Sequence, residues 1–201
     1  MAVHTSRIGR PRAFDPEAAL EKAMMVFWAQ GYEGASLTDL TEAMGISRKS
    51  LYAAYGNKED LFRKALQRYA EGPGAYVTEA LQAPTAREVA MAFLVGAARA
   101  NTLPGLPAGC LGVQGALAAG ETGRVARDTL AEWRAHGQTL LRDRFRQAVQ
   151  VGDLPADADP GKIARYVMTI ANGVAVQAAG GATCEDLQQV ADAALRNWPP
   201  A

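Results

Sequence analysis

The chain has 201 residues, 49% of them hydrophobic, and its 21 Lys/Arg residues balance its 21 Asp/Glu residues. This length can bury a full core, and the apolar content excludes an intrinsically disordered protein. Because the net charge is zero, affinity for nucleic acid has to come from a local patch. The two cysteines, Cys110 and Cys184, form neither a metal-ligand spacing nor a disulfide framework.

The polar, Arg-rich N-terminus is unlike a secretory signal peptide. Residues 166–184 carry no charge, but Thr169, Asn172, Gln177 and several glycines argue against a membrane span. We therefore expect a soluble, cytoplasmic protein.

Residues 1–13 are predicted to form a flexible basic arm, in which Arg10 and Arg12 flank Pro11 and no acid precedes Asp15. Such an arm can enter a minor groove or follow phosphates, and a plain disordered tail would have the same composition. Arg10 and Arg12 are therefore candidate DNA contacts.

A first helix is predicted after this arm, because Asp15 is a good N-cap and Pro16 suits the first helical position. Gly31 is expected to end it. Its apolar stripe consists of Leu20, Met24, Phe27 and Trp28.

Two short amphipathic helices joined at Gly45 are predicted next, over residues 36–55. Ser36 can cap the first, with Asp39 completing a capping box, and Ser47 can cap the second. Gly45 can adopt the left-handed conformation that ends a helix. The pair has the form of a helix-turn-helix that reads a DNA major groove.

The outward face of the second helix carries the expected chemistry. Arg48, Lys49 and Tyr52 share that face, since they are one and four residues apart. From Ala43 to Lys58 the charged residues are all basic, and such an acid-free window suits a phosphate backbone. A solvated helical hairpin in an all-α protein is the alternative interpretation.

The rest of the chain also shows helical periodicity and no convincing strand. Asn57 can cap a fourth helix, which Gly72-Pro73-Gly74 ends, and further helices are predicted over residues 85–102, 109–119, 122–151, 160–179 and 184–198. The expected fold is all-α with about nine helices. A helix-turn-helix head is expected over residues 14–70, and a larger helical body is expected over residues 71–201.

Several short motifs follow one another in the first seventy residues: GRPRAFD at 9–15, AM and FW within 23–28, GYE at 31–33, SLTDL at 36–40, MGIS at 44–47, SLY at 50–52 and KEDLF at 58–62. Their combination resembles the head of a TetR/AcrR-family transcriptional regulator, whereas the body matches only in its pattern of helices. The resemblance implies an all-α homodimer whose heads bind a palindromic operator and whose body holds a small-molecule effector.

The resemblance also assigns roles in the head. It implies phosphate contacts at the starts of the second and fourth helices and within the recognition helix, by Ser36, Thr38, Tyr52 and Lys58. It implies base reading at the start of the recognition helix, where Ser47 is followed by Arg48, Lys49 and Ser50. Many relatives have a His two positions after the Tyr; this chain has Ala54, so that contact is absent.

Six candidate effector contacts lie between the predicted body helices: Met91, Phe93, Cys110, Gln114, Trp133 and His136. An apolar pocket with a few polar groups suits a hydrophobic or aromatic effector, although plain core or surface roles fit the same residues. Cys110 follows a Pro/Gly loop at a predicted helix N-terminus, which favours a thiolate. A buried, inert small side chain is the alternative for Cys110.

The last two helices are expected to form the dimer interface, because a single chain would struggle to bury both apolar stripes. The stripes contain Ile163, Val167, Ile170, Val174, Leu187, Val190 and Ala194.

An effector-released, dimeric repressor is thus the expected function. The alternatives are an all-α enzyme or small-molecule carrier with an incidental basic hairpin, and a thiol-based redox-sensing repressor that uses Cys110. The sequence has no phosphate-binding glycine loop, paired metal ligands or Ser-His-Asp order, so we expect no enzyme, no cofactor and no metal site.

Overall fold

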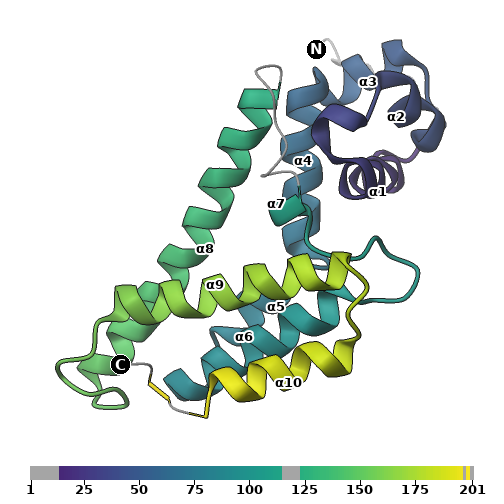
Figure 1. Ribbon diagram of the computed structural model, residues 1–201. Coiled ribbons are helices and arrows are strands. Elements are labelled where there is room, and N and C mark those ends of the chain that lie inside the picture. Colours follow the sequence, from purple (N-terminus) through teal and green to yellow (C-terminus); the bar gives the residue numbers. More distant parts are fainter. Residues whose placement is uncertain (1–13, 115–122, 197, 200–201) are drawn as a thin grey trace, which may run out of the picture.

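The structure is a computed structural model that describes residues 14–114, 123–196 and 198–199. The predicted arm, with Arg10 and Arg12, lies outside the described residues, as does the second half of the helix predicted over 109–119. Every regular element in the described part is a helix, which confirms the all-α prediction. Figure 1 shows a head of helices above a layered helical body, and one long helix rises from the body beside the head.

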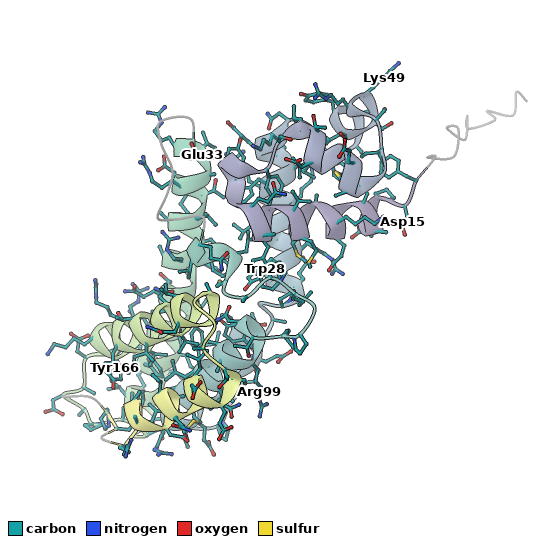
Figure 2. All side chains as sticks on the ribbon, turned by 45° about the vertical axis from the view of Figure 1, so that its right-hand side comes forward. Asp15, Trp28, Glu33, Lys49, Arg99 and Tyr166 are labelled. Atoms are coloured by element: carbon teal, nitrogen blue, oxygen red, sulfur yellow. The ribbon has the colours of Figure 1, made fainter. Side chains whose placement is uncertain are left out.

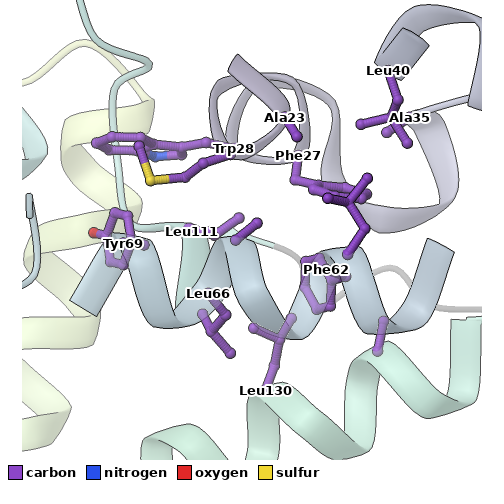
Figure 3. Close-up of a cluster of buried hydrophobic side chains, with 14 of the residues drawn as sticks. Ala23, Phe27, Trp28, Ala35, Leu40, Phe62, Leu66, Tyr69, Leu111 and Leu130 are labelled. Carbon is purple, nitrogen blue, oxygen red and sulfur yellow. The ribbon is translucent and has the colours of Figure 1, made fainter. Parts of the chain in front are cut away.

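Four helices form the head: α1 (Pro16–Gly34), α2 (Leu37–Met44), α3 (Arg48–Tyr55) and α4 (Lys58–Glu71). Phe27 of α1 and Phe62 of α4 are both buried, with ring centroids 5.1 Å apart in an edge-to-face arrangement. Figure 3 shows these rings in the layer between the two helices, beside Leu40 of α2. The head therefore has an aromatic core that holds α1 against α4, and α2 packs on α1 beside it.

The predicted caps fix where the head helices begin. The Asp39 backbone N–H donates to Ser36 Oγ at 3.1 Å, and Asp39 Oδ2 accepts from the Ser36 N–H at 2.9 Å, so the capping box is confirmed. Gly45 lies at φ 68°, as predicted for the end of α2. Gly31, at φ 71°, breaks the regular geometry of α1 three residues before its last residue.

The body contains α5 (Tyr76–Ala80), α6 (Ala86–Asn101), α7 (Leu111–Gln114), α8 (Arg124–Gln150), α9 (Pro160–Ala179) and α10 (Cys184–Ala194). In Figure 1, α9 and α10 lie across α6, and α8 runs from the body towards the head. The helix predicted to reach residue 198 ends at Ala194, and α5 was not predicted. The described residues thus hold ten helices where about nine were expected.

The apolar stripes of α9 and α10 mostly face the core of the chain itself. Ile163, Val167, Val174 and Leu187 are each at most 2% exposed, because α6 packs beneath both helices. The expectation that one chain could not bury both stripes is therefore wrong. Ile170 and Ala194 are half-buried, and Val190, at 47% exposed, lies on the outer face.

The short α7 lies where the head meets the body, in contact with α1, α4, α8 and α9. Just before it, the carbonyl oxygen of Gly109 accepts a buried hydrogen bond of 2.9 Å from Trp28 Nε1 of α1. Figure 2 shows Trp28 at this junction. Among the described helices, none combines the length and hydrophobicity needed to cross a membrane.

Candidate DNA-reading surface and effector cavity

The outward face of α3 carries the predicted DNA-reading side chains. Arg48, Lys49 and Tyr52 are exposed, whereas Leu51 and Tyr55 are buried in the head. The Tyr55 hydroxyl donates to the Pro16 carbonyl oxygen at 2.7 Å, which fastens α3 to the start of α1. Figure 2 shows Lys49 pointing away from the body at the far end of the head. The exposed face of α3 is therefore held in place by the core of the head and is free to contact a partner.

Hydroxyl groups connect the starts of α2 and α3. Arg48 Nη2 donates to Thr38 Oγ1 at 2.9 Å, so the guanidinium of α3 reaches back to α2. Ser47 Oγ accepts from the Ser50 N–H at 3.1 Å and lies 3.0 Å from Ser50 Oγ. Two helix N-termini with exposed hydroxyls form a surface suited to anions such as phosphate.

Lys58 begins α4 and lies over an aromatic ring. Its Nζ is 4.4 Å from the ring centroid of Tyr32, a cation–π distance. Partial burial lowers the pKa of Lys58, and the carboxylates of Glu33 and Asp39 act in the opposite direction. Lys58 thus stands near the start of α2, among the other predicted phosphate contacts.

The body contains a cavity of about 170 Å³ between α5, α6, α8 and α9. Four of the six predicted effector contacts line it: Phe93, Cys110, Trp133 and His136. The other two do not. Met91 packs against the body core, and Gln114 Nε2 donates to the carbonyl oxygen of Ala108, which closes the turn before α7.

Several residues of the cavity wall were missed from the sequence. Asn101, at the end of α6, is 1% exposed, and both polar atoms of its amide lack a hydrogen-bond partner in the described part of the chain. Arg134 also lines the cavity, and its Nη1 donates to the Gly112 carbonyl oxygen at 2.7 Å. Asn101 continues the buried series Val89, Phe93 and Ala97 in four-residue steps, so its burial could have been predicted.

The thiol of Cys110 lies in this cavity wall, where its surroundings favour the neutral, protonated form. The residue is 4% exposed, and burial raises the pKa of the thiol. The Tyr69 hydroxyl and the backbone N–H groups of Gly112 and Val113 oppose this rise but do not overcome it. Of the two interpretations that the sequence left open for Cys110, these observations favour the buried, neutral thiol over a thiolate at a helix N-terminus.

One residue, Gly109, links the cavity wall to the head. The Gly109 N–H donates to the Asn101 carbonyl oxygen at 2.9 Å, and the Gly109 carbonyl oxygen accepts from Trp28. Gly109 lies at φ +87°, and a Cβ there would collide with the Gln114 side chain. The cavity wall and α1 of the head are thus joined through two consecutive hydrogen bonds.

Models of known protein families match both the head and the body of the chain. A family model described as "Bacterial regulatory proteins, tetR family" matches residues 19–65. A second, described as "Tetracyclin repressor-like, C-terminal domain", matches residues 90–194. The chain belongs to the TetR family of transcriptional regulators.

Two transcriptional repressors of Escherichia coli are similar to this chain over most of its length. The HTH-type transcriptional repressor ComR of Escherichia coli (strain K12) is 35% identical over 193 residues, which cover 95% of this chain and 92% of ComR. The HTH-type transcriptional repressor BdcR of the same strain is 28% identical over 181 residues, which cover 89% of this chain and 86% of BdcR.

Among solved structures, a cysteine mutant of the TetR family transcriptional regulator CifR is similar over nearly the whole chain. Its sequence identity is 44% and the TM-score is 0.90, with 94% of this chain and 100% of the CifR chain covered. That CifR mutant is complexed with 26 bp double-strand operator DNA.

Proposed function

We propose that this protein is a homodimeric transcriptional repressor that binds a palindromic operator and releases it when a small molecule occupies the body cavity. The main support for DNA binding is the outward face of α3, on which Arg48, Lys49 and Tyr52 are exposed. The opposite face of the same helix is buried in the core of the head. ComR and BdcR are named repressors, and the similar CifR structure holds operator DNA. A cytoplasmic location follows from this function.

In this proposal, residues 14–70 read the DNA with the arm 1–13 as an additional contact, and residues 71–201 sense the effector and dimerise. Lys49 and Arg48 contact base edges, with Ser47 and Ser50 beside them. DNA phosphates are contacted by residues at the start of α2, within α3 and at the start of α4, namely Ser36, Thr38, Tyr52 and Lys58.

The test is titration of the purified chain with a fluorescent duplex that contains palindromes from the DNA upstream of its own gene. Lys49→Ala and Arg48→Ala should each weaken binding and relax base choice, by about 1–3 kcal/mol for a good base contact. Lys58→Ala should weaken binding to all duplexes alike and reduce the slope of log affinity against log salt by about one.

The Arg48 contact with Thr38 gives this experiment an internal control. Thr38→Val removes the acceptor of Arg48 Nη2 and one proposed phosphate contact but leaves the guanidinium charge, so it should weaken binding to all duplexes alike and cost less affinity than Arg48→Ala. If Arg48→Ala and Lys49→Ala bind every operator variant as the parent does, α3 does not read bases. If no duplex is bound above non-specific affinity, the alternative of an all-α enzyme or carrier is favoured.

The dimer in this proposal forms through the outer face of α9 and α10. Val176 of α9 is 49% exposed and Val190 of α10 is 47% exposed, which leaves two large apolar side chains uncovered. Gly173 lies one turn before Val176, and a Cβ there would meet open space. Two such faces meeting about a two-fold axis would form a closely packed four-helix bundle.

A further inference from the structure

The amide of Asn101 is the strongest unexplained feature of the cavity. Among the described residues it is the one buried amide side chain, and neither its Oδ1 nor its Nδ2 has a hydrogen-bond partner there. The Tyr69 hydroxyl is the other buried group without a conventional hydrogen bond, and it lies beside the Cys110 thiol. Leaving a buried donor or acceptor unpaired costs about 1–3 kcal/mol for each group. A leucine of similar shape would avoid this cost, so the amide indicates a ligand that supplies the missing partners.

The rest of the wall restricts the size and polarity of that ligand. The cavity volume of about 170 Å³ is close to that of an engineered apolar cavity, about 150 Å³, that binds benzene. Most of the lining is apolar, including Phe93, Val113, Met168 and Ala175. The ligand is therefore compact, about the size of one six-membered ring with a short substituent.

Charge on the wall restricts the ligand further. No Asp or Glu is among the lining residues, whereas Arg134 is. A buried ammonium group would have no counter-charge there and would lie near a guanidinium, which is costly. A carboxylate could pair with Arg134, but beside Asn101 it would place acceptor against acceptor at Oδ1.

An amide group fits Asn101 at both atoms. Its carbonyl oxygen accepts from Nδ2 while its N–H donates to Oδ1, so two parallel hydrogen bonds form side by side. We propose that the cavity binds a compact, neutral and mostly apolar molecule whose amide group, a carboxamide or a lactam, pairs with Asn101.

The ligand position also explains how the head would respond. The carbonyl oxygen of Asn101 accepts from the Gly109 N–H, and Gly109 in turn holds Trp28 of α1. A ligand that displaces the Asn101 side chain therefore acts on Gly109, the residue that joins the body to the head. This regulatory part rests on the proposed repressor function, whereas the ligand class does not.

Benzamide and acetophenone provide the test, because they have nearly the same shape and differ by the amide NH₂ and a methyl group. Calorimetric titration of the full chain should show benzamide binding about tenfold more tightly than acetophenone, the difference expected for one or two net hydrogen bonds. Benzylammonium and benzoate should bind more weakly than benzamide. Equal binding of benzamide and acetophenone, or no benzamide binding, would overturn the proposal.

Two variants assign the preference to one side chain. Asn101→Leu should abolish the preference for benzamide and unfold at a higher temperature than the ligand-free parent, because the unpaired amide is gone. Asn172→Leu makes the same change elsewhere on the cavity wall and should keep the preference. Loss of the preference in Asn172→Leu, with retention in Asn101→Leu, would show that Asn101 is not the recognition group.

Operator titrations separate this inference from the proposed function. With benzamide present, the parent should bind operator at least tenfold more weakly, and Asn101→Leu should be unaffected. Operator binding without benzamide binding would refute the ligand class alone. Benzamide binding with unchanged operator affinity would refute the regulatory link, and benzamide binding without any operator binding would refute the repressor function but not the ligand class.

Discussion

Cys110 shows, at the scale of a single residue, how burial outweighs a local electrostatic preference. A helix N-terminus favours a thiolate, but α7 has four residues and the thiol is nearly inaccessible. Burial raises the pKa of Cys110, and the N–H groups of Gly112 and Val113 compensate only in part. The side chain is therefore a neutral thiol in the cavity wall.

We predict that iodoacetamide labels Cys184 before Cys110 in the folded protein, as peptide mass spectrometry would show, because Cys184 is partly exposed. The pKa of Cys110 is raised on folding, so its contribution to stability is fully present below about pH 8.5, the usual cysteine value. That contribution is lost as the pH rises towards the folded value. Cys110→Ala should therefore make unfolding less dependent on pH in the alkaline range.

Faster labelling of Cys110 than of Cys184 would contradict this prediction. It would also favour the alternative in which an electrophile entering the cavity acts through Cys110, since the thiol lies in the cavity wall. Cys184→Ser is the matched control for both measurements, because it leaves the cavity intact.

At the scale of elements, α7 is held by a close approach to α8. A Cβ at Gly112 would lie 2.2 Å from Cζ3 of Trp133, so Gly112 packs directly on the indole ring. We predict that Gly112→Ala forces the ring to move and destabilises the protein by about 1–3 kcal/mol in urea unfolding.

Gly137→Ala is the matched control for Gly112→Ala. Gly137 lies in α8 among the residues that line the cavity, but its added Cβ would meet Met168 Cε at an ordinary 3.9 Å. A helical Ala there should stabilise the protein by about 0.5–1 kcal/mol. Equal effects of the two substitutions would show that the Gly112–Trp133 contact does not constrain α7.

Capping residues explain why the head was predictable from sequence. Asp15, Ser36, Ser47 and Asn57 each accept backbone N–H bonds at the helix starts where their side chains predicted them. No such signal marks α5, since Ala75 precedes it without a side-chain cap. Local chemistry thus locates elements that carry their own caps, and misses a single turn held by tertiary packing.

Helical periodicity in the sequence predicts which face of α9 is apolar, but it does not predict what covers that face. The spacing of Ile163, Val167 and Val174 predicts an apolar face on α9, and that face exists. Periodicity does not say whether the covering surface belongs to the same chain or to a partner. Here α6 covers it, and the number of helices available for packing is a property of the whole fold rather than of the α9 sequence.

At the scale of the whole molecule, the Trp28 hydrogen bond joins the head to the body. We predict that Trp28→Phe leaves the buried Gly109 carbonyl without its donor and lowers the free energy of unfolding by about 1–3 kcal/mol, in addition to a packing loss. Trp133→Phe removes a partly exposed indole and should cost less. An equal loss of urea stability in both variants would show that the hydrogen bond contributes nothing beyond packing.

The outer face of α9 and α10 sets the expected arrangement of two copies. Substitutions at Val174 would not test it, because Val174 is 2% exposed and a charge there would disrupt the core of one chain. We predict instead that Val176→Glu with Val190→Glu yields a folded monomer in light scattering, because like charges would meet across the two-fold axis. That monomer should bind an operator half-site but lose the tight binding of a full palindrome, in which two heads engage together.

Val151→Glu is the matched control, since Val151 is 72% exposed at the end of α8, away from this face. A dimer that persists in the double variant would place the interface on another surface.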